Sequence, residues 1–262
     1  MYRKRTWNLR RGRKVVDDHT GSRRRKGEKR GKREKPSTEA KKALNHKRVT
    51  EKCLMRLREY FKPDDYFVTM MYGKDERPAN MEEAKKDRKA IYEYLKREYK
   101  KRGEELRWIC NIECGQKGAW HLHWIINRIP DTDLILRQAW ERIARRGSLN
   151  IKLLHEQDGN FSKLAEYICK DPDSTARAKD AGGAKAVLRE SDMSCSRNMP
   201  IPEPEVKEIR RSDTWGAVRV PEGFYLDKDS YYEGINPFTG YRYREYWLLP
   251  LGEQKCIKHT FT

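Results

Sequence analysis

The sequence predicts an α+β fold, and three observations support that class. Over residues 66–170 the apolar residues alternate between the two-residue period of a strand and the 3.6-residue period of a helix, in the order β-α-β-β-α-β-α. Only a short glycine-bounded segment separates the two middle strands, which predicts a β-hairpin. Pro172 ends the last helix. This order is that of a ferredoxin-like (split βαβ) domain with a C-terminal extension, whose central antiparallel sheet carries His121 and His123.

The first strand and the first long helix have the clearest local signals. Residues 66–72 are apolar and aromatic and end at Gly73, which predicts a strand. Asn80 is a candidate N-cap for a helix over residues 81–101, where apolar residues recur at helical spacing. A further helical pattern, the lead-in over residues 37–62, precedes the strand.

The hairpin and the elements that follow it come from the same patterns. Residues 106–113 and 120–127 are the two apolar runs that predict the hairpin strands. The remaining elements are a helix that begins at residue 131 or 132 and reaches 143, a strand over 149–154 and a helix over 161–170.

Positive charge is concentrated at the start of the chain. The net charge is +19 over 262 residues, and residues 1–50 contain 20 Lys and Arg against 5 Asp and Glu. Because residues 22–33 lack any apolar periodicity, we expect residues 1–36 to be a basic disordered tail. Such a tail binds polyanions, and nucleic acid is the favoured partner. A solvated arm without a dedicated partner is the alternative.

The rest of the chain is predicted to contain a linker and a small terminal segment. Residues 173–212 include a Gly- and Ala-rich stretch and three closely spaced prolines, which indicate a linker. Residues 213–262 are rich in aromatics and glycines and predict a small C-terminal segment of short strands. We expect no membrane association, because no apolar run approaches the length of a membrane span. The six cysteines, without an export signal, indicate reduced thiols in a cytoplasmic protein.

Two histidines lie one residue apart within the second hairpin strand. Side chains alternate along a strand, so His121 and His123 share one face while their apolar neighbours occupy the other. If the glycine-bounded segment is the turn, Glu113 lies opposite or diagonal to His121. Two imidazoles and a carboxylate form an N,N,O set that suits Mn²⁺, Mg²⁺ or Zn²⁺. The alternative is a set of ordinary polar residues on the solvated face of a half-buried strand.

A tyrosine and a lysine share one face of the last predicted helix. Tyr167 and Lys170 are three residues apart, so they lie side by side on the helix. A phenol is a poor nucleophile at neutral pH, but a metal-polarised phosphodiester and a nearby ammonium group make its attack feasible. The alternative is an amphipathic tyrosine followed by a lysine that interacts favourably with the helix dipole.

In their order and spacing, these motifs resemble those of the HUH endonucleases, and within them the rolling-circle replication initiator (Rep) proteins of small phages and plasmids. The resemblance covers residues 63–172, which we expect to form the endonuclease domain. It rests on the apolar run at residues 67–72, the pair His121 and His123, and the Y-x-x-K motif of Tyr167 and Lys170. A stretch over residues 192–198 is weakly similar to the one that follows this domain in phage-type members.

The resemblance implies site-specific nicking and joining of single-stranded DNA at a replication origin. It implies that His121, His123 and Glu113 hold Mn²⁺ or Mg²⁺ and that Tyr167 forms a 5′-phosphotyrosine, assisted by Lys170. No second tyrosine stands four residues from Tyr167, which implies a single-tyrosine enzyme. There is also no phosphate-loop motif of an ATPase, which implies a host helicase and polymerase as partners in the bacterial cytoplasm.

Three other functions are compatible with these residues. A plasmid-mobilisation relaxase and a single-tyrosine transposase would use the same site. A non-catalytic basic nucleic-acid-binding protein would carry the histidines as surface residues only.

Overall fold

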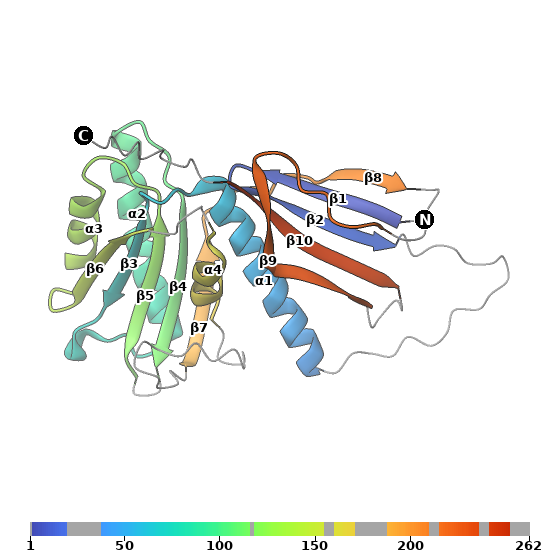
Figure 1. Ribbon diagram of the computed structural model, residues 1–262. Coiled ribbons are helices and arrows are strands. Elements are labelled where there is room, and N and C mark those ends of the chain that lie inside the picture. The colour runs from blue at the N-terminus through green and yellow to red at the C-terminus, as the bar shows by residue number, and fades with distance from the viewer. Residues whose placement is uncertain are drawn as a thin grey trace, which may run out of the picture. The chain divides into compact units, whose positions relative to one another are not determined.

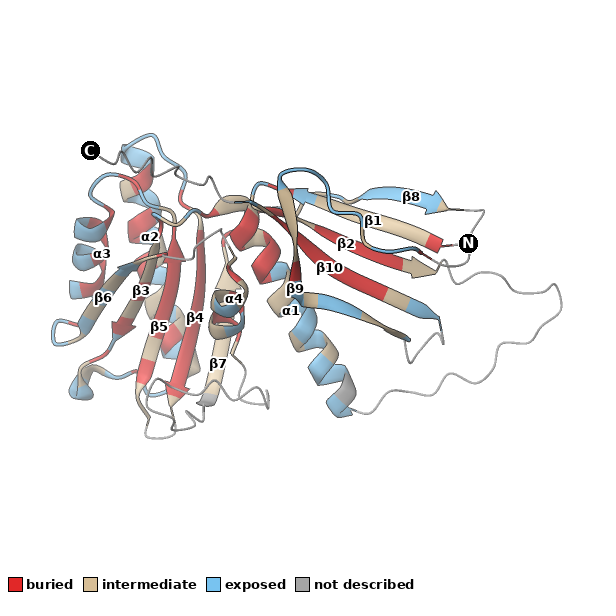
Figure 2. Ribbon diagram, viewed as in Figure 1, coloured by how far each residue is buried: buried red, intermediate tan, exposed pale blue. Residues whose placement is uncertain are grey.

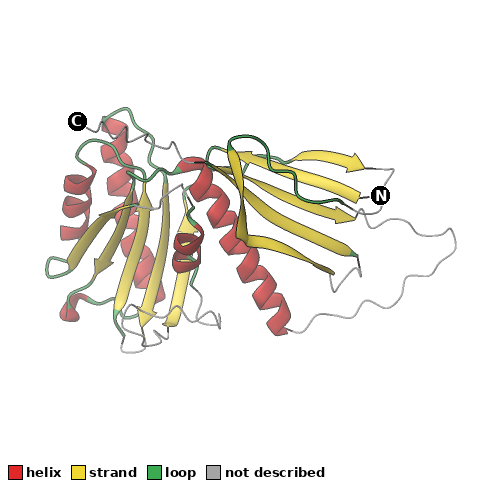
Figure 3. Cartoon of the chain, viewed as in Figure 1, coloured by secondary structure: helices red, strands yellow, loops and turns green. Residues whose placement is uncertain are grey.

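The computed structural model describes residues 2–19, 38–115, 118–154, 160–170, 188–209, 215–235 and 241–251. Within them the protein is α+β, as predicted, with two antiparallel sheets and four α-helices. The chain divides into unit 1, which is Met1–Pro36 with Pro202–Thr262, and unit 2, which is Ser37–Ile201. Each unit contains one of the two sheets (Figure 3). Of the described helices, none has the length and apolar character needed to span a membrane.

The sheet of unit 2 has five strands in the order β6-β3-β5-β4-β7, with antiparallel neighbours throughout (Figure 1). The strands are β3 (Tyr66–Met71), β4 (Trp108–Gly115), β5 (Trp120–Ile126), β6 (Ser148–Leu153) and β7 (Leu188–Cys195). The helices of unit 2 are α1 (Thr38–Tyr60), α2 (Met81–Lys101), α3 (Thr132–Glu141) and α4 (Ser162–Ile168), with a 3-10 turn η1 (Lys74–Glu76) after β3. From β3 to α4 these strands and α-helices occur in the predicted order.

One face of this sheet forms the main hydrophobic core of unit 2. Helices α2 and α3 supply apolar side chains to that core, and alternate residues of β4 and β5 face them. Leu122 and Trp124 are completely buried, and both strands are buried along most of their length (Figure 2). Complete burial of an aliphatic side chain such as Leu122 contributes about 1.5–3 kcal/mol. The core therefore fixes which face of β5 is left for its polar residues.

Helices α1 and α4 contact each other and belong to the same unit. Leu57 of α1 and Ala165 and Ile168 of α4 are fully buried. The contact also contains a polar link, because Nη2 of Arg58 donates a hydrogen bond to Oδ1 of Asn160 at 2.9 Å. The helix that the sequence predicts as a lead-in is therefore packed into unit 2 rather than preceding it as a separate segment.

The prediction of a disordered tail over residues 1–36 is wrong for residues 2–19. They form β1 (Tyr2–Leu9) and β2 (Gly12–His19), which pair along their whole length. The physical reason is that the arginines and lysines of these strands have carboxylate partners. Both Arg3 and Arg5 bind Asp18, at 2.8 and 3.0 Å. Residues 20–37 lie outside the described part of the chain.

The linker and the small C-terminal segment are also corrected by the structure. Within residues 173–212, β7 is the edge strand beside β4 in unit 2, and β8 (Glu205–Ile209) pairs with β1 in unit 1. Strands β9 (Phe224–Ile235) and β10 (Arg242–Pro250) complete the unit 1 sheet, whose order is β8-β1-β2-β10-β9. The two ends of the chain thus form one sheet, because β10 pairs with β2. Residues 171–187, 210–214, 236–240 and 252–262 are outside the described residues.

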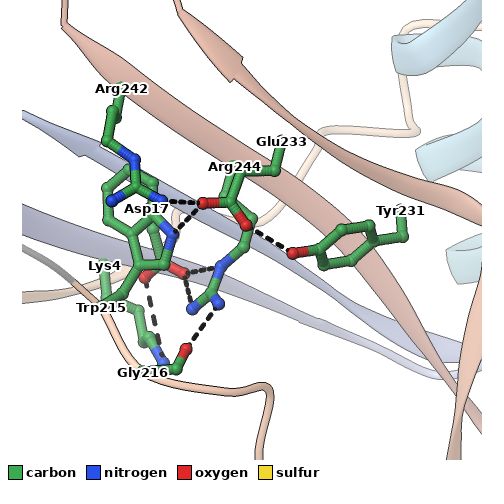
Figure 4. Close-up of polar contacts among 8 residues, drawn as sticks. All are labelled: Lys4, Asp17, Trp215, Gly216, Tyr231, Glu233, Arg242 and Arg244. Carbon is green, nitrogen blue, oxygen red and sulfur yellow. Dashed lines mark hydrogen bonds and ion pairs between the residues drawn. The ribbon is translucent and has the colours of Figure 1, made fainter.

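A buried ion pair links the two ends of the chain within the unit 1 sheet (Figure 4). Asp17 on β2 is 0% exposed and Arg244 on β10 is 3% exposed. Both Nε and Nη2 of Arg244 donate to Oδ2 of Asp17, at 2.9 and 2.6 Å, and Nη1 donates to the carbonyl oxygen of Gly216 at 2.7 Å. Removing one member of a buried pair leaves a desolvated charge, so this sheet depends on the intact pair.

We therefore expect Arg244→Ala to lower the free energy of unfolding by about 3–5 kcal/mol, because Asp17 would stay buried without its cation. Lys207→Ala, on the exposed strand β8 of the same sheet, should change it by less than about 0.5 kcal/mol. Urea titration followed by circular dichroism measures both values. Equal stabilities of the two variants would contradict this role of the pair.

Candidate functional site

The second face of the unit 2 sheet carries a group of polar residues from three adjacent strands. In the β4–β5 ladder Glu113 lies directly opposite His121, and Asn111 lies opposite His123. On the other side of β5, Thr69 of β3 also lies opposite His123. The two imidazole rings share this face, with centroids 6.1 Å apart and planes at 18°. The strand periodicity that predicted the shared face is therefore reflected in the side-chain positions.

His123 is the centre of the contacts. Its Nε2 lies 3.5 Å from Oε2 of Glu113, and its Nδ1 lies 3.2 Å from Oγ1 of Thr69. The amide Nδ2 of Asn111 donates a hydrogen bond to the other carboxylate oxygen, Oε1 of Glu113, at 3.0 Å. Glu113, His123 and Asn111 are 4%, 5% and 0% exposed, so the group is almost fully withdrawn from water. Such burial strengthens each of these interactions.

The electrostatic environment sets the charge of the carboxylate and of one imidazole. Burial alone would raise the pKa of Glu113, but the contact with His123, the charge of Lys170 and the hydrogen bond from Asn111 together lower it. Burial is also the main cause that lowers the pKa of His121 below its ordinary value, and His123 adds to the effect. At neutral pH the site therefore holds an ionised Glu113 and a neutral His121 whose nitrogen lone pair is available.

Helix α4 brings the predicted nucleophile to this group. The ring of Tyr167 meets that of His123 edge to face, with centroids 5.3 Å apart and planes at 79°. The Nζ atom of Lys170 lies 3.8 Å from the centroid of the Tyr167 ring. The buried side of the short helix, at Ala165 and Ile168, holds it in place so that Tyr167 and Lys170 face the histidines. Residues that are far apart in the sequence thus converge at one site.

Three neighbouring residues were not singled out from the sequence. Phe67 stacks on His123, with centroids 5.8 Å apart and planes at 10°, and meets the edge of Tyr167 at 5.7 Å. It therefore packs against both the histidine and the tyrosine. Thr69 and Asn111 are the other two. Their signal was the alternation along β3 and β4, which places them on the face opposite the residues that these strands give to the core.

The donors at this site have the chemistry of a divalent-metal site, although only two of the three predicted ligands are in direct contact. Among the residues that the structure describes, no three His, Cys, Asp or Glu side chains are grouped closely enough to hold a metal ion. The pair Glu113 and His123 is in contact, and His121 lies beside it on the same face. In addition, Oδ1 of Asn111 is buried without a hydrogen-bond partner. An unpaired buried oxygen next to a carboxylate and imidazoles fits a cation such as Mn²⁺ or Mg²⁺.

One comparison with known proteins identifies a related family. Residues 65–172 match the family model of replication-associated protein ORF2, which covers less than half of the chain. The matched segment runs from β3 to just beyond α4 and contains every residue of the site described above. No curated protein and no solved structure matches the chain.

We expect His121 to titrate below pH 6.5 in the metal-free protein, because burial and His123 disfavour its charged form. Glu113→Gln should lower this pKa further, since the charge of Glu113 favours protonation of His121. NMR titration of the imidazole protons measures both. Glu141→Gln on α3, which packs on the opposite face of the sheet, is the matched control and should leave the titration unchanged. A titration of His121 above pH 6.5, or one unaffected by Glu113→Gln, would contradict the described environment.

Proposed function

We propose that this protein is a rolling-circle replication initiator that nicks and rejoins single-stranded DNA at an origin through a 5′-phosphotyrosine intermediate. The observation that carries the proposal is the convergence of Tyr167 and Lys170 on the Glu113–His123 pair. A tyrosine against an imidazole–carboxylate pair, with an ammonium over its ring, is an arrangement suited to phosphoryl transfer.

Two further observations support the proposal. The family match covers residues 65–172, and its name refers to replication. The strand order β6-β3-β5-β4, with α2 and α3 on one face, is that expected for a ferredoxin-like domain of the HUH type. The site then lies on the face of the sheet opposite the covering helices α2 and α3.

In the proposed site, His121, His123 and Glu113 hold Mn²⁺ or Mg²⁺. When bound, such an ion polarises the scissile phosphate and offsets its negative charge. Asn111 orients the carboxylate of Glu113 through its hydrogen bond to Oε1. Thr69 holds the ring of His123 through the contact with Nδ1, which leaves Nε2 directed at Glu113. Phe67 fixes the plane of the same ring by stacking on it.

Tyr167 supplies the nucleophile. Its hydroxyl oxygen attacks the phosphorus, the phenol proton passes to a solvent base, and the bond from phosphorus to the 3′ oxygen breaks. The leaving oxygen takes a proton from water and becomes a free 3′-OH that can prime a polymerase. Lys170 stabilises the phenolate charge that develops, because its ammonium lies over the ring. The phosphotyrosine keeps the energy of the broken ester, so the reverse attack by a 3′-OH rejoins the strand without ATP.

The first test is covalent capture of DNA. Incubation of the full chain with single-stranded oligonucleotides and Mn²⁺ should give a protein–DNA adduct that survives denaturing electrophoresis. Tyr167→Phe should abolish the adduct, because it removes the attacking oxygen and leaves the ring contacts. Tyr92→Phe, on α2 against the opposite face of the sheet, is the matched control and should form the adduct as the wild type does. An adduct of equal yield with Tyr167→Phe would exclude Tyr167 as the nucleophile.

The second test addresses the metal. The double variant His121→Ala/His123→Ala should lose binding of Mn²⁺, measured by isothermal titration calorimetry in the absence of DNA. It should reduce nicking by about 100-fold or more, since a metal contributes several kcal/mol to such a transition state. His19→Gln in unit 1 is the control and should retain both properties. Unchanged binding of Mn²⁺ by the double variant would refute the proposed ligand set.

A further inference from the structure

A groove in unit 2 begins beside the proposed nucleophile. It has a volume of about 550 Å³ and lies between α1, the end of α4 and β7. That volume is within the range of about 300–1,000 Å³ typical of ligand sites. Its lining from α1 consists of Lys42, Asn45, His46 and Val49. These residues are spaced at i, i+3, i+4 and i+7, so they form one continuous face of the helix.

The lining of the groove favours an anion. Lys42 and Lys170 bring two ammonium groups from different elements, and His46 and Asn45 add hydrogen-bond donors. The groove has one carboxylate among its described lining residues, Asp192. That charge is offset outside the groove, because Asp192 lies 2.8 Å from Nη2 of Arg88 and 3.5 Å from Nζ of Lys85. The net charge facing the groove is therefore positive.

Lys170 joins the groove to the nucleophile. It lines the groove and also places its Nζ 3.8 Å from the centroid of the Tyr167 ring. Its backbone position is fixed from β7, since Oγ of Ser191 donates to the carbonyl oxygen of Lys170 at 2.9 Å. A chain of phosphates whose scissile member lies at Tyr167 would thus reach Lys170 and then Lys42 in succession. The exposed apolar side chain of Val49 offers a contact for a sugar or a base along the same path.

We propose that this groove binds the sugar–phosphate backbone of the single-stranded DNA that flanks the scissile phosphate, with α1 as one wall. The identity of the strand as substrate rests on the proposed function. The positive groove and its continuity with Lys170 carry the assignment of its path.

The test compares two adjacent lysines of α1. Lys42 lines the groove, whereas Lys41 is exposed on the same helix and is not among the residues that line it. Binding of a fluorescein-labelled oligothymidylate is measured by anisotropy at several salt concentrations, with Tyr167→Phe present to prevent cleavage. Lys42→Gln should weaken binding about fivefold near 0.1 M salt and reduce the salt slope by about 0.7, the loss of one phosphate contact. Lys41→Gln carries the same net charge and should bind as the parent does.

Equal affinities and equal slopes for the two lysine variants would overturn the proposal. The same variants with Tyr167 intact separate it from the proposed function. Adduct formation without a difference in binding between the lysine variants would reject the groove and retain the nicking activity. A difference in binding without any adduct from the wild type would reject nicking and retain the groove as a DNA-binding site.

Discussion

The geometry of the site depends on the strict alternation of side chains along β4 and β5. One face of these strands is committed to the core against α2 and α3, so their polar residues must share the other face. The register then sets Glu113 opposite His121 and Asn111 opposite His123. A shift of one residue would bury the histidines in the core and expose Leu122. The packing that stabilises unit 2 thus also positions the polar group.

The elements of unit 2 were predictable because their signals are local. Each strand and helix from β3 to α4 follows from the period of its own apolar residues and from nearby glycine, proline or capping residues. The side-chain contacts were less predictable. The sequence placed Glu113 opposite or diagonal to His121, but the carboxylate contacts His123, and Phe67 stacks on that same ring. Such contacts depend on rotamers and on strands distant in sequence, which periodicity does not encode.

The prediction for unit 1 failed because its stabilising contacts are remote and polar. Asp17 and Arg244 are 227 residues apart, and the strands that carry them are rich in charge. Composition alone cannot distinguish a solvated basic arm from a strand whose cations are paired. Much of the charge of β1 and β2 is paired, since Arg3 and Arg5 bind Asp18, and Lys14 binds Glu245. The excess of positive charge at the chain start therefore overstates what these two strands offer to nucleic acid.

The same physical reasoning distinguishes the polar group of unit 2 from a merely structural one. An ionised carboxylate and an unpaired amide oxygen are both costly to bury, the latter by about 1–3 kcal/mol. Yet the pKa of Glu113 is lowered despite burial, and Oδ1 of Asn111 has no partner. A core under selection for stability alone would replace both with apolar side chains. A cation among these oxygens and imidazole nitrogens would satisfy them together, so the residues that weaken the fold are those that the proposed chemistry requires.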